Sequence, residues 1–127
     1  MDLTIKKSNG TTDIVWTQTA SAVADGTPAV FTSKTAHSLP IGQPTFSMKT
    51  AYSSNRTARR ARLAFEMPIV AEVNGRTQRV GTIPFEFGGL LPTDQPSAVT
   101  DEAVDQFINL LASPSIRTAL KVMLAPR

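Results

Sequence analysis

The chain has 127 residues, contains no cysteine, carries a formal net charge of +3 and is 41% hydrophobic. That length suits one domain, residues 1–127, and the hydrophobic content is typical of a folded chain rather than a disordered tail. The lack of cysteine excludes disulfides and thiolate metal sites. The N-terminus, MDLTIKKSNG, has no apolar segment of the kind that a secretion signal needs, and no apolar run approaches ~18 residues, so we expect neither a secretion signal nor a membrane span.

The first half of the chain is predicted to form short strands. Residues 3–7 and 13–18 are β-type runs joined by a segment that contains Asn9-Gly10, a pair that favours a hairpin because both residues tolerate positive φ. A polar stretch follows, and then a further β-type run at 29–35. Residues 45–53 alternate, with Phe46 and Met48 on one face and polar side chains on the other.

The segment 55–67 is rich in arginine at its start and apolar at its end. Read with a period of two, Arg60 and Arg62 share one face while Leu63 and Phe65 share the other. A helix would spread the apolar residues around its circumference, and Pro68 would cost it ~3 kcal/mol. The pattern therefore predicts a strand, which continues to a second hairpin signal at Asn74-Gly75.

The strand after that hairpin places apolar and polar residues on opposite faces. Ile83, Phe85 and Phe87 are predicted to face one side, opposite Thr82, Pro84 and Glu86. Pro84 has no N–H to donate to a neighbouring strand. This implies an edge strand, a bulge or a position at which the backbone nitrogen faces away from the neighbouring strand.

The last third of the chain is helical in pattern. Thr100 is predicted to cap a helix with acids in its first turn, and Ser113-Pro114 to end it and begin another, with Lys121 near the end of the second. The apolar side chains recur at helical spacing: Val104, Phe107, Ile108, Leu111, Ile116, Leu120, Met123 and Leu124. About seven strands followed by two helices indicate an α+β fold.

The sequence offers little for catalysis. His37 is the one histidine and is predicted to be an exposed loop residue, since no second His or Cys could join it in a metal site. Ser38 next to it lacks an orienting acid. Glu66, Glu72 and Glu86 are expected to form salt bridges with nearby arginines rather than a catalytic pair. We therefore predict no enzyme, no metal and no cofactor.

Positive charge is concentrated in one region. Six arginines and two glutamates lie between residues 55 and 79, and alternation places a mixed polar set on one sheet face: Thr45, Ser47, Lys49, Arg60, Arg62, Thr82 and Glu86. Arginine offers forked donors to phosphate, and hydroxyl groups bond to bases and sugars, so this set is compatible with RNA. From periodicity alone a solvated face with solubility charges is the favoured interpretation, because arginines on an exposed strand are common, and RNA binding stays open as the other.

Several stretches resemble the coat proteins of small single-stranded RNA bacteriophages, the levivirus coat protein family. Ser54-Asn55-Arg56 leading into a basic alternating strand is similar to that family's loop and RNA-facing strand. Phe65-Glu66-Met67-Pro68 is similar to the end of that strand. Thr100-Asp101-Glu102 begins a predicted helix that ends at residues 110–114, and this segment is similar to the helix pair of the family. The resemblance extends over nearly the whole chain, and it rests on the order of the predicted strands and helices.

The resemblance implies a hairpin at 2–19, a five-stranded antiparallel sheet within 28–91 and helices within 100–126. It further implies an interlocked dimer with a continuous sheet, held by helix residues that pack across the partner: Val104, Phe107, Ile108, Leu111, Ile116 and Leu120. Dimers of this family build an icosahedral shell, assembled in the cytoplasm of a bacterial host, with the sheet facing the RNA genome. The virion is therefore the expected location, and the expected partners are further copies of the chain and single-stranded RNA.

The family's RNA-facing positions correspond here to Thr45, Ser47, Lys49, Asn55, Arg60, Arg62, Thr82 and Glu86. Ala64 departs from the family pattern, in which a lysine or another polar residue is usual. The short connection at Val73-Asn74-Gly75-Arg76 also departs, because relatives often have a longer loop there. An RNA hairpin that represses translation is a further function of the family. A non-viral dimeric RNA-binding regulator is the alternative function.

Overall fold

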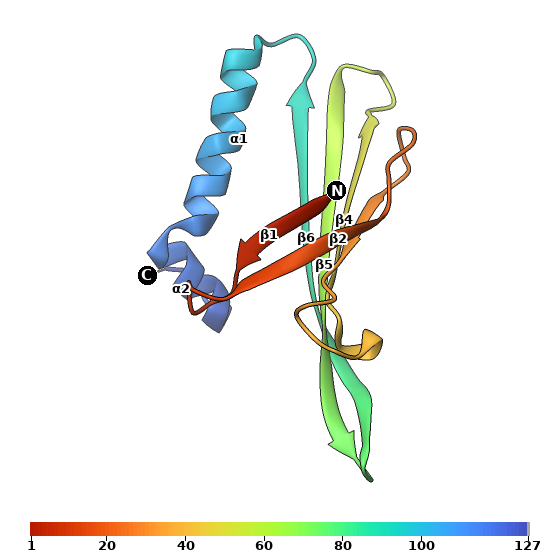
Figure 1. Ribbon diagram of the computed structural model, residues 1–127. Coiled ribbons are helices and arrows are strands. Elements are labelled where there is room, and N and C mark those ends of the chain that lie inside the picture. Colours follow the sequence, from red (N-terminus) through yellow and green to blue (C-terminus); the bar gives the residue numbers. More distant parts are fainter. Residues whose placement is uncertain (127) are drawn as a thin grey trace. The chain divides into compact units, whose positions relative to one another are not determined.

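The apolar and polar alternation of the first 92 residues produces an antiparallel meander (Figure 1). The computed structural model describes residues 1–126 and divides the chain into two units, Met1–Leu90 and Leu91–Arg127. Six strands make one sheet in chain order: β1 (Asp2–Lys6), β2 (Asp13–Ala20), β3 (Ala29–Thr32), β4 (Thr45–Tyr52), β5 (Ala58–Val73) and β6 (Arg76–Pro92). A 3-10 turn, η1 (Pro40–Gly42), lies between β3 and β4.

The α+β class is confirmed, with one difference in how the strands are grouped. The resemblance predicted a hairpin apart from a five-stranded sheet, whereas β2 pairs with β3 and the six strands form one sheet. About seven strands were predicted from the pattern, whereas residues 1–126 form six. The basic segment and its continuation past Pro68 form a single 16-residue strand, as predicted. Pro84 lies in β6, which is an edge strand of this sheet, one of the three alternatives that its missing N–H allowed.

The register of β4 and β5 determines what each sheet face carries. Phe46 lies opposite Phe65 and Met48 opposite Leu63, while Lys49 lies opposite Arg62. Because neighbours along a strand point to opposite faces, one face of this pair is apolar and the other is polar and basic. The predicted alternation of both strands is therefore confirmed.

The core lies on the apolar face and is built from aromatic rings. Trp16 of β2 is 5% exposed, and its ring lies 5.9 Å from that of Phe65 on β5, although two strands separate β2 from β5 in the sheet order. The β1–β2 hairpin must therefore fold across the apolar face, as Figure 1 shows. Phe65 in turn contacts Phe85 of β6 at 6.3 Å, and Phe31, 8% exposed, contacts Phe46 at 6.2 Å.

Side-chain hydroxyls extend the pairing of β2 beyond the short strand β3. Ser33 is fully buried, and its hydroxyl donates to the carbonyl of Val15 at 2.9 Å. The amide of Val15 donates to the hydroxyl of Thr35 at 2.8 Å. These bonds satisfy backbone groups of β2 that would otherwise lack a partner strand.

The two predicted hairpins both form, but with different turns. Asn74 (φ 52°) and Gly75 (φ 77°) make a two-residue turn between β5 and β6, as the Asn-Gly pair predicts. The connection of β1 and β2 is longer, at residues 7–12, and only Gly10 has a positive φ there. Asn9 acts through its side chain instead, accepting bonds from the amides of Thr11 (3.1 Å) and Thr12 (3.0 Å).

The second unit contains α1 (Ser97–Ala112) and α2 (Pro114–Val122), and the chain turns sharply between them (Figure 1). Pro114 begins α2 and Lys121 lies in its last turn, as predicted. The predicted cap at Thr100 is wrong, because α1 begins earlier, with Pro96 at the N-cap position. The Thr100 hydroxyl instead donates to the carbonyl of Ser97 at 3.1 Å, inside the first turn, and the acids follow later.

Candidate nucleic-acid interface

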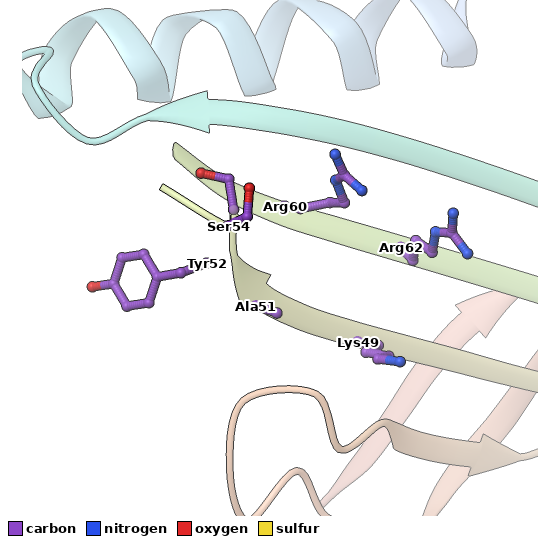
Figure 2. Close-up of a pocket in the computed structure, with 7 residues that line it drawn as sticks. Lys49, Ala51, Tyr52, Ser54, Arg60 and Arg62 are labelled. Atoms are coloured by element: carbon purple, nitrogen blue, oxygen red, sulfur yellow. The ribbon is translucent and has the colours of Figure 1, made fainter. Parts of the chain in front are cut away.

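The polar face of β4 and β5 brings together most of the predicted site. The register places Lys49 opposite Arg62, Ala51 opposite Arg60, Ser47 opposite Ala64 and Thr45 opposite Glu66. Alternation along each strand puts all of these side chains on one face. Figure 2 shows Arg60 and Arg62 projecting from β5 to the same side, near Lys49 of β4.

A hollow of about 350 Å³ lies at one end of this face. Its lining combines three cations with three small side chains and one tyrosine: Lys49, Ala51, Tyr52, Ser53, Ser54, Arg60 and Arg62. The ring of Tyr52 points away from Arg60 and Arg62 in Figure 2. We call this lined hollow the basic pocket. No acidic residue lines it, so it presents positive charge and hydroxyl groups to a ligand.

A second hollow, of about 380 Å³, lies on the other side of the two arginines. Arg60 and Arg62 line it together with Gly88, Gly89 and Leu90 of β6. The two glycines have no side chains to fill the space beside β5. The arginines therefore stand between two open spaces, with room for a ligand on each side.

The cations of the basic pocket have no carboxylate partner within residues 1–126. Across residues 1–126, the ion pairs are Lys6 with Asp13 and Arg59 with Asp25. The salt bridges predicted from Glu66, Glu72 and Glu86 to the nearby arginines are absent within those residues, so that prediction was wrong. The register explains part of this, because it sets Glu66 opposite Thr45 rather than opposite an arginine.

The remaining predicted site residues lie apart from the basic pocket. Asn55 organises the turn between β4 and β5, because its amide oxygen accepts bonds from the hydroxyls of Ser53 (2.9 Å) and Thr57 (2.7 Å). Thr82 accepts a bond from Arg79 at 2.6 Å. Glu86 is exposed on β6 and neighbours Phe85, which contacts the apolar face, so alternation puts Glu86 on the polar face.

Sequence reasoning missed Ser53 and Ser54, which line the basic pocket, and the ion pair of Arg59 with Asp25. A signal for the ion pair was present. Arg59 is in phase with Leu63 and Phe65, so it lies on the apolar face, where a guanidinium needs a partner. No motif indicated which acid would supply that partner.

The helix residues predicted to hold a dimer leave much apolar surface uncovered in the single chain. Phe107 is 51% exposed and Ile108 56%, while Leu111 and Ile116 are half-buried. Neither helix has a buried residue. Apolar side chains on the sheet, such as Met48 and Ile83, are also open to solvent.

Other kinds of site find no support in the part of the chain that the structure describes. Residues 1–126 contain no group of three or more His, Asp or Glu side chains that could hold a metal ion. None of the helices described is long and apolar enough to cross a membrane.

Comparison with solved structures identifies the fold. The virus-like particle of Beihai levi-like virus 21 matches 99% of this chain and 96% of its own, with a TM-score of 0.81 and 15% identity. The virus-like particle of bacteriophage NT-214 matches 100% and 96%, with a TM-score of 0.79 and 18% identity. The capsid protein of bacteriophage GA matches 98% and 95%, with a TM-score of 0.73 and 12% identity. The chain has the RNA-phage coat protein fold.

The coat protein fold is visible in the structure but not in sequence comparison. No protein-family model matches the chain, and no curated protein matches it in sequence. The matches span nearly the full length of this chain and of each matched chain, so the sheet and both helices belong to the coat protein fold. The predicted resemblance, which depended on the order of the elements, is confirmed at the level of the fold.

Proposed function

We propose that this chain is a structural capsid protein that dimerises, assembles into an icosahedral shell in a bacterial host and packages single-stranded RNA. The observation that carries the proposal is a sheet of coat protein fold with two different faces. One face bears Lys49, Arg60 and Arg62 without acidic partners in residues 1–126. The other is apolar, covered in part by the β1–β2 hairpin and exposed at side chains such as Met48 and Ile83. A shell protein needs both, one face for the genome and one for other copies.

The basic pocket is the proposed contact with RNA phosphates. Arginine presents forked donors that match phosphate oxygens, and lysine adds a mobile point charge. The hydroxyl groups of Ser53, Ser54 and Ser47 extend the polar surface along the strands and suit sugars and base edges. Cations and hydroxyl groups arranged in this way favour a flexible single strand of RNA, whose phosphates can reach the basic pocket.

Recognition of a particular RNA hairpin, and repression of translation through it, belong to the same proposal. Ala64 lies opposite Ser47 on the polar face and supplies a methyl group where a polar side chain would contact a base. Any base selection at this position must therefore come from neighbours such as Arg62 and Ser47. We propose that packaging depends mainly on phosphate contacts and that hairpin recognition uses Arg62.

The apolar surface of the chain supports a dimer. Among the large apolar side chains of residues 1–126, Trp16 and Phe31 alone are buried, although a chain of this length has enough apolar residues for a larger core. We propose that residues 1–127 act as one coat-protein domain and that the helices pack on a second copy. The unpaired edge of β6 is available to continue the sheet into that copy.

The RNA contact is tested by replacing one arginine of the basic pocket. Arg62→Ala should weaken binding of a short fluorescent single-stranded RNA and lower the slope of log affinity against log salt by about 0.7, the value for one phosphate contact. Fluorescence anisotropy over a salt series measures both quantities, and sedimentation verifies that the variant is still a dimer.

Arg117→Ala is the matched control, because it removes the same charge from an exposed position on α2. It should leave the salt slope unchanged. Equal slopes for wild type and Arg62→Ala would contradict the assignment of the polar face to RNA. RNA binding by a dimer that never forms particles would favour the non-viral regulator instead.

A further inference from the structure

We propose that Asp25 is a positioning residue for the basic pocket. Through Arg59 and Tyr52 it braces the end of the β4–β5 hairpin and so fixes the turn whose serines line the pocket. The expected effect on RNA binding rests on the proposed function, whereas the contacts that form the brace do not depend on it.

The brace is a chain of contacts on the apolar side of the hairpin end. The Asp25 carboxylate accepts two bonds from the Arg59 guanidinium, at 2.8 Å and 3.2 Å, which is the forked geometry that fixes both groups. The same guanidinium lies over the ring of Tyr52, 4.4 Å from its centroid. Tyr52 and Arg59 are opposite one another and form the last pair of β4 and β5.

The backbone around Asp25 is attached to the same hairpin. The amide of Gly26 donates to the carbonyl of Thr50 on β4 at 2.9 Å, and Gly26 has a φ of 84° that favours glycine. The segment that carries Asp25 is therefore held at β4 by a backbone bond as well as at β5 by the ion pair. The Arg59 pairing also lowers the pKa of the Asp25 carboxyl, so the carboxylate is charged at neutral pH.

The braced end leads directly into the wall of the basic pocket. Residues 53–57 connect Tyr52 to Ala58, and the turn is closed by the amide of Ser53 donating to the carbonyl of Ala58 at 2.8 Å. Ser53 and Ser54 line the pocket, and Arg60 follows Arg59 on the opposite face. Fixing Tyr52 and Arg59 on one face therefore fixes the backbone that presents Ser53, Ser54 and Arg60 on the other.

Two roles for Asp25 give opposite results on substitution. If Asp25 merely neutralises an arginine that would otherwise bind phosphate, Asp25→Asn should strengthen RNA binding and steepen its salt dependence. If Asp25 is part of a brace, the substitution loosens the pocket, and binding should weaken although the protein has gained a positive charge.

The test measures binding of a short single-stranded RNA to Asp25→Asn, Arg59→Gln and the double variant over a salt series. We expect each single variant to lose roughly three- to ten-fold in affinity and the double variant to lose no more than either, since coupled residues are not additive. The slope for Asp25→Asn should match that of wild type. Tighter binding, an unchanged affinity or additive losses would each overturn the proposal.

Asp13→Asn is the matched control, because it opens the ion pair with Lys6 on the distant β1–β2 hairpin and changes the net charge equally. It should bind RNA as wild type does. Amide hydrogen exchange at Ser53 and Ala58 tests the brace without RNA: exchange should be faster in Asp25→Asn, and unchanged exchange would refute the brace. Absence of RNA binding by wild type would contradict the proposed function, while the exchange measurement would still decide the brace.

Discussion

At the scale of single residues, the packing of Gly42 against His37 fixes the segment that enters β4. Gly42 is buried, and a Cβ added there would lie 2.6 Å from the imidazole ring. The ring also accepts a bond from the amide of Leu39 at 3.0 Å through Nδ1. His37 was predicted to be an exposed loop residue, but it is half-buried and packs against the 3-10 turn.

Substitution of Gly42 tests this packing. Gly42→Ala should lower the free energy of unfolding by about 1–3 kcal/mol, because the added methyl group forces the imidazole ring out of its place. Urea denaturation measures the change. Gly81→Ala is the control, since its methyl group would lie 3.5 Å from the nearest side-chain atom, an ordinary contact. Equal stability of the two variants would contradict the tight packing.

At the scale of elements, the accuracy of the predictions follows from how local their causes are. The β5–β6 turn was predictable because Asn74 and Gly75 adopt the required positive φ by themselves. The start of α1 was missed by four residues, because Pro96 at the N-cap and a first turn without acids gave a weaker signal than Thr100 with its acids. The polar face of β4 and β5 was predictable from period two alone.

The apolar stripe of α1 makes a prediction of its own. Leu111→Asp should abolish the soluble dimer, because each subunit loses about 1.5–3 kcal/mol of apolar burial and the carboxylate also loses its hydration. Analytical ultracentrifugation measures the dimer, with Asn109→Asp as the control at an exposed position of the same helix. A normal dimer formed by Leu111→Asp would contradict packing of this stripe on a second copy.

At the scale of the whole molecule, long-range packing is what the sequence could not supply. The fold of the β1–β2 hairpin across the apolar face, which brings Trp16 to Phe65, depends on contacts 49 positions apart in the chain (65 − 16). The partner of Arg59 was equally hidden, because Asp25 lies 34 positions away in a polar stretch with no motif. The order and type of the elements were nonetheless sufficient to indicate the coat protein fold.

The central claim is that this chain forms an RNA-filled shell, and electron microscopy of the protein expressed in bacteria tests it most directly. The purified protein should appear as closed particles, and nuclease treatment followed by extraction should recover RNA protected inside them. A protein that remains monomeric or dimeric in every buffer, and that carries no RNA, would contradict the account.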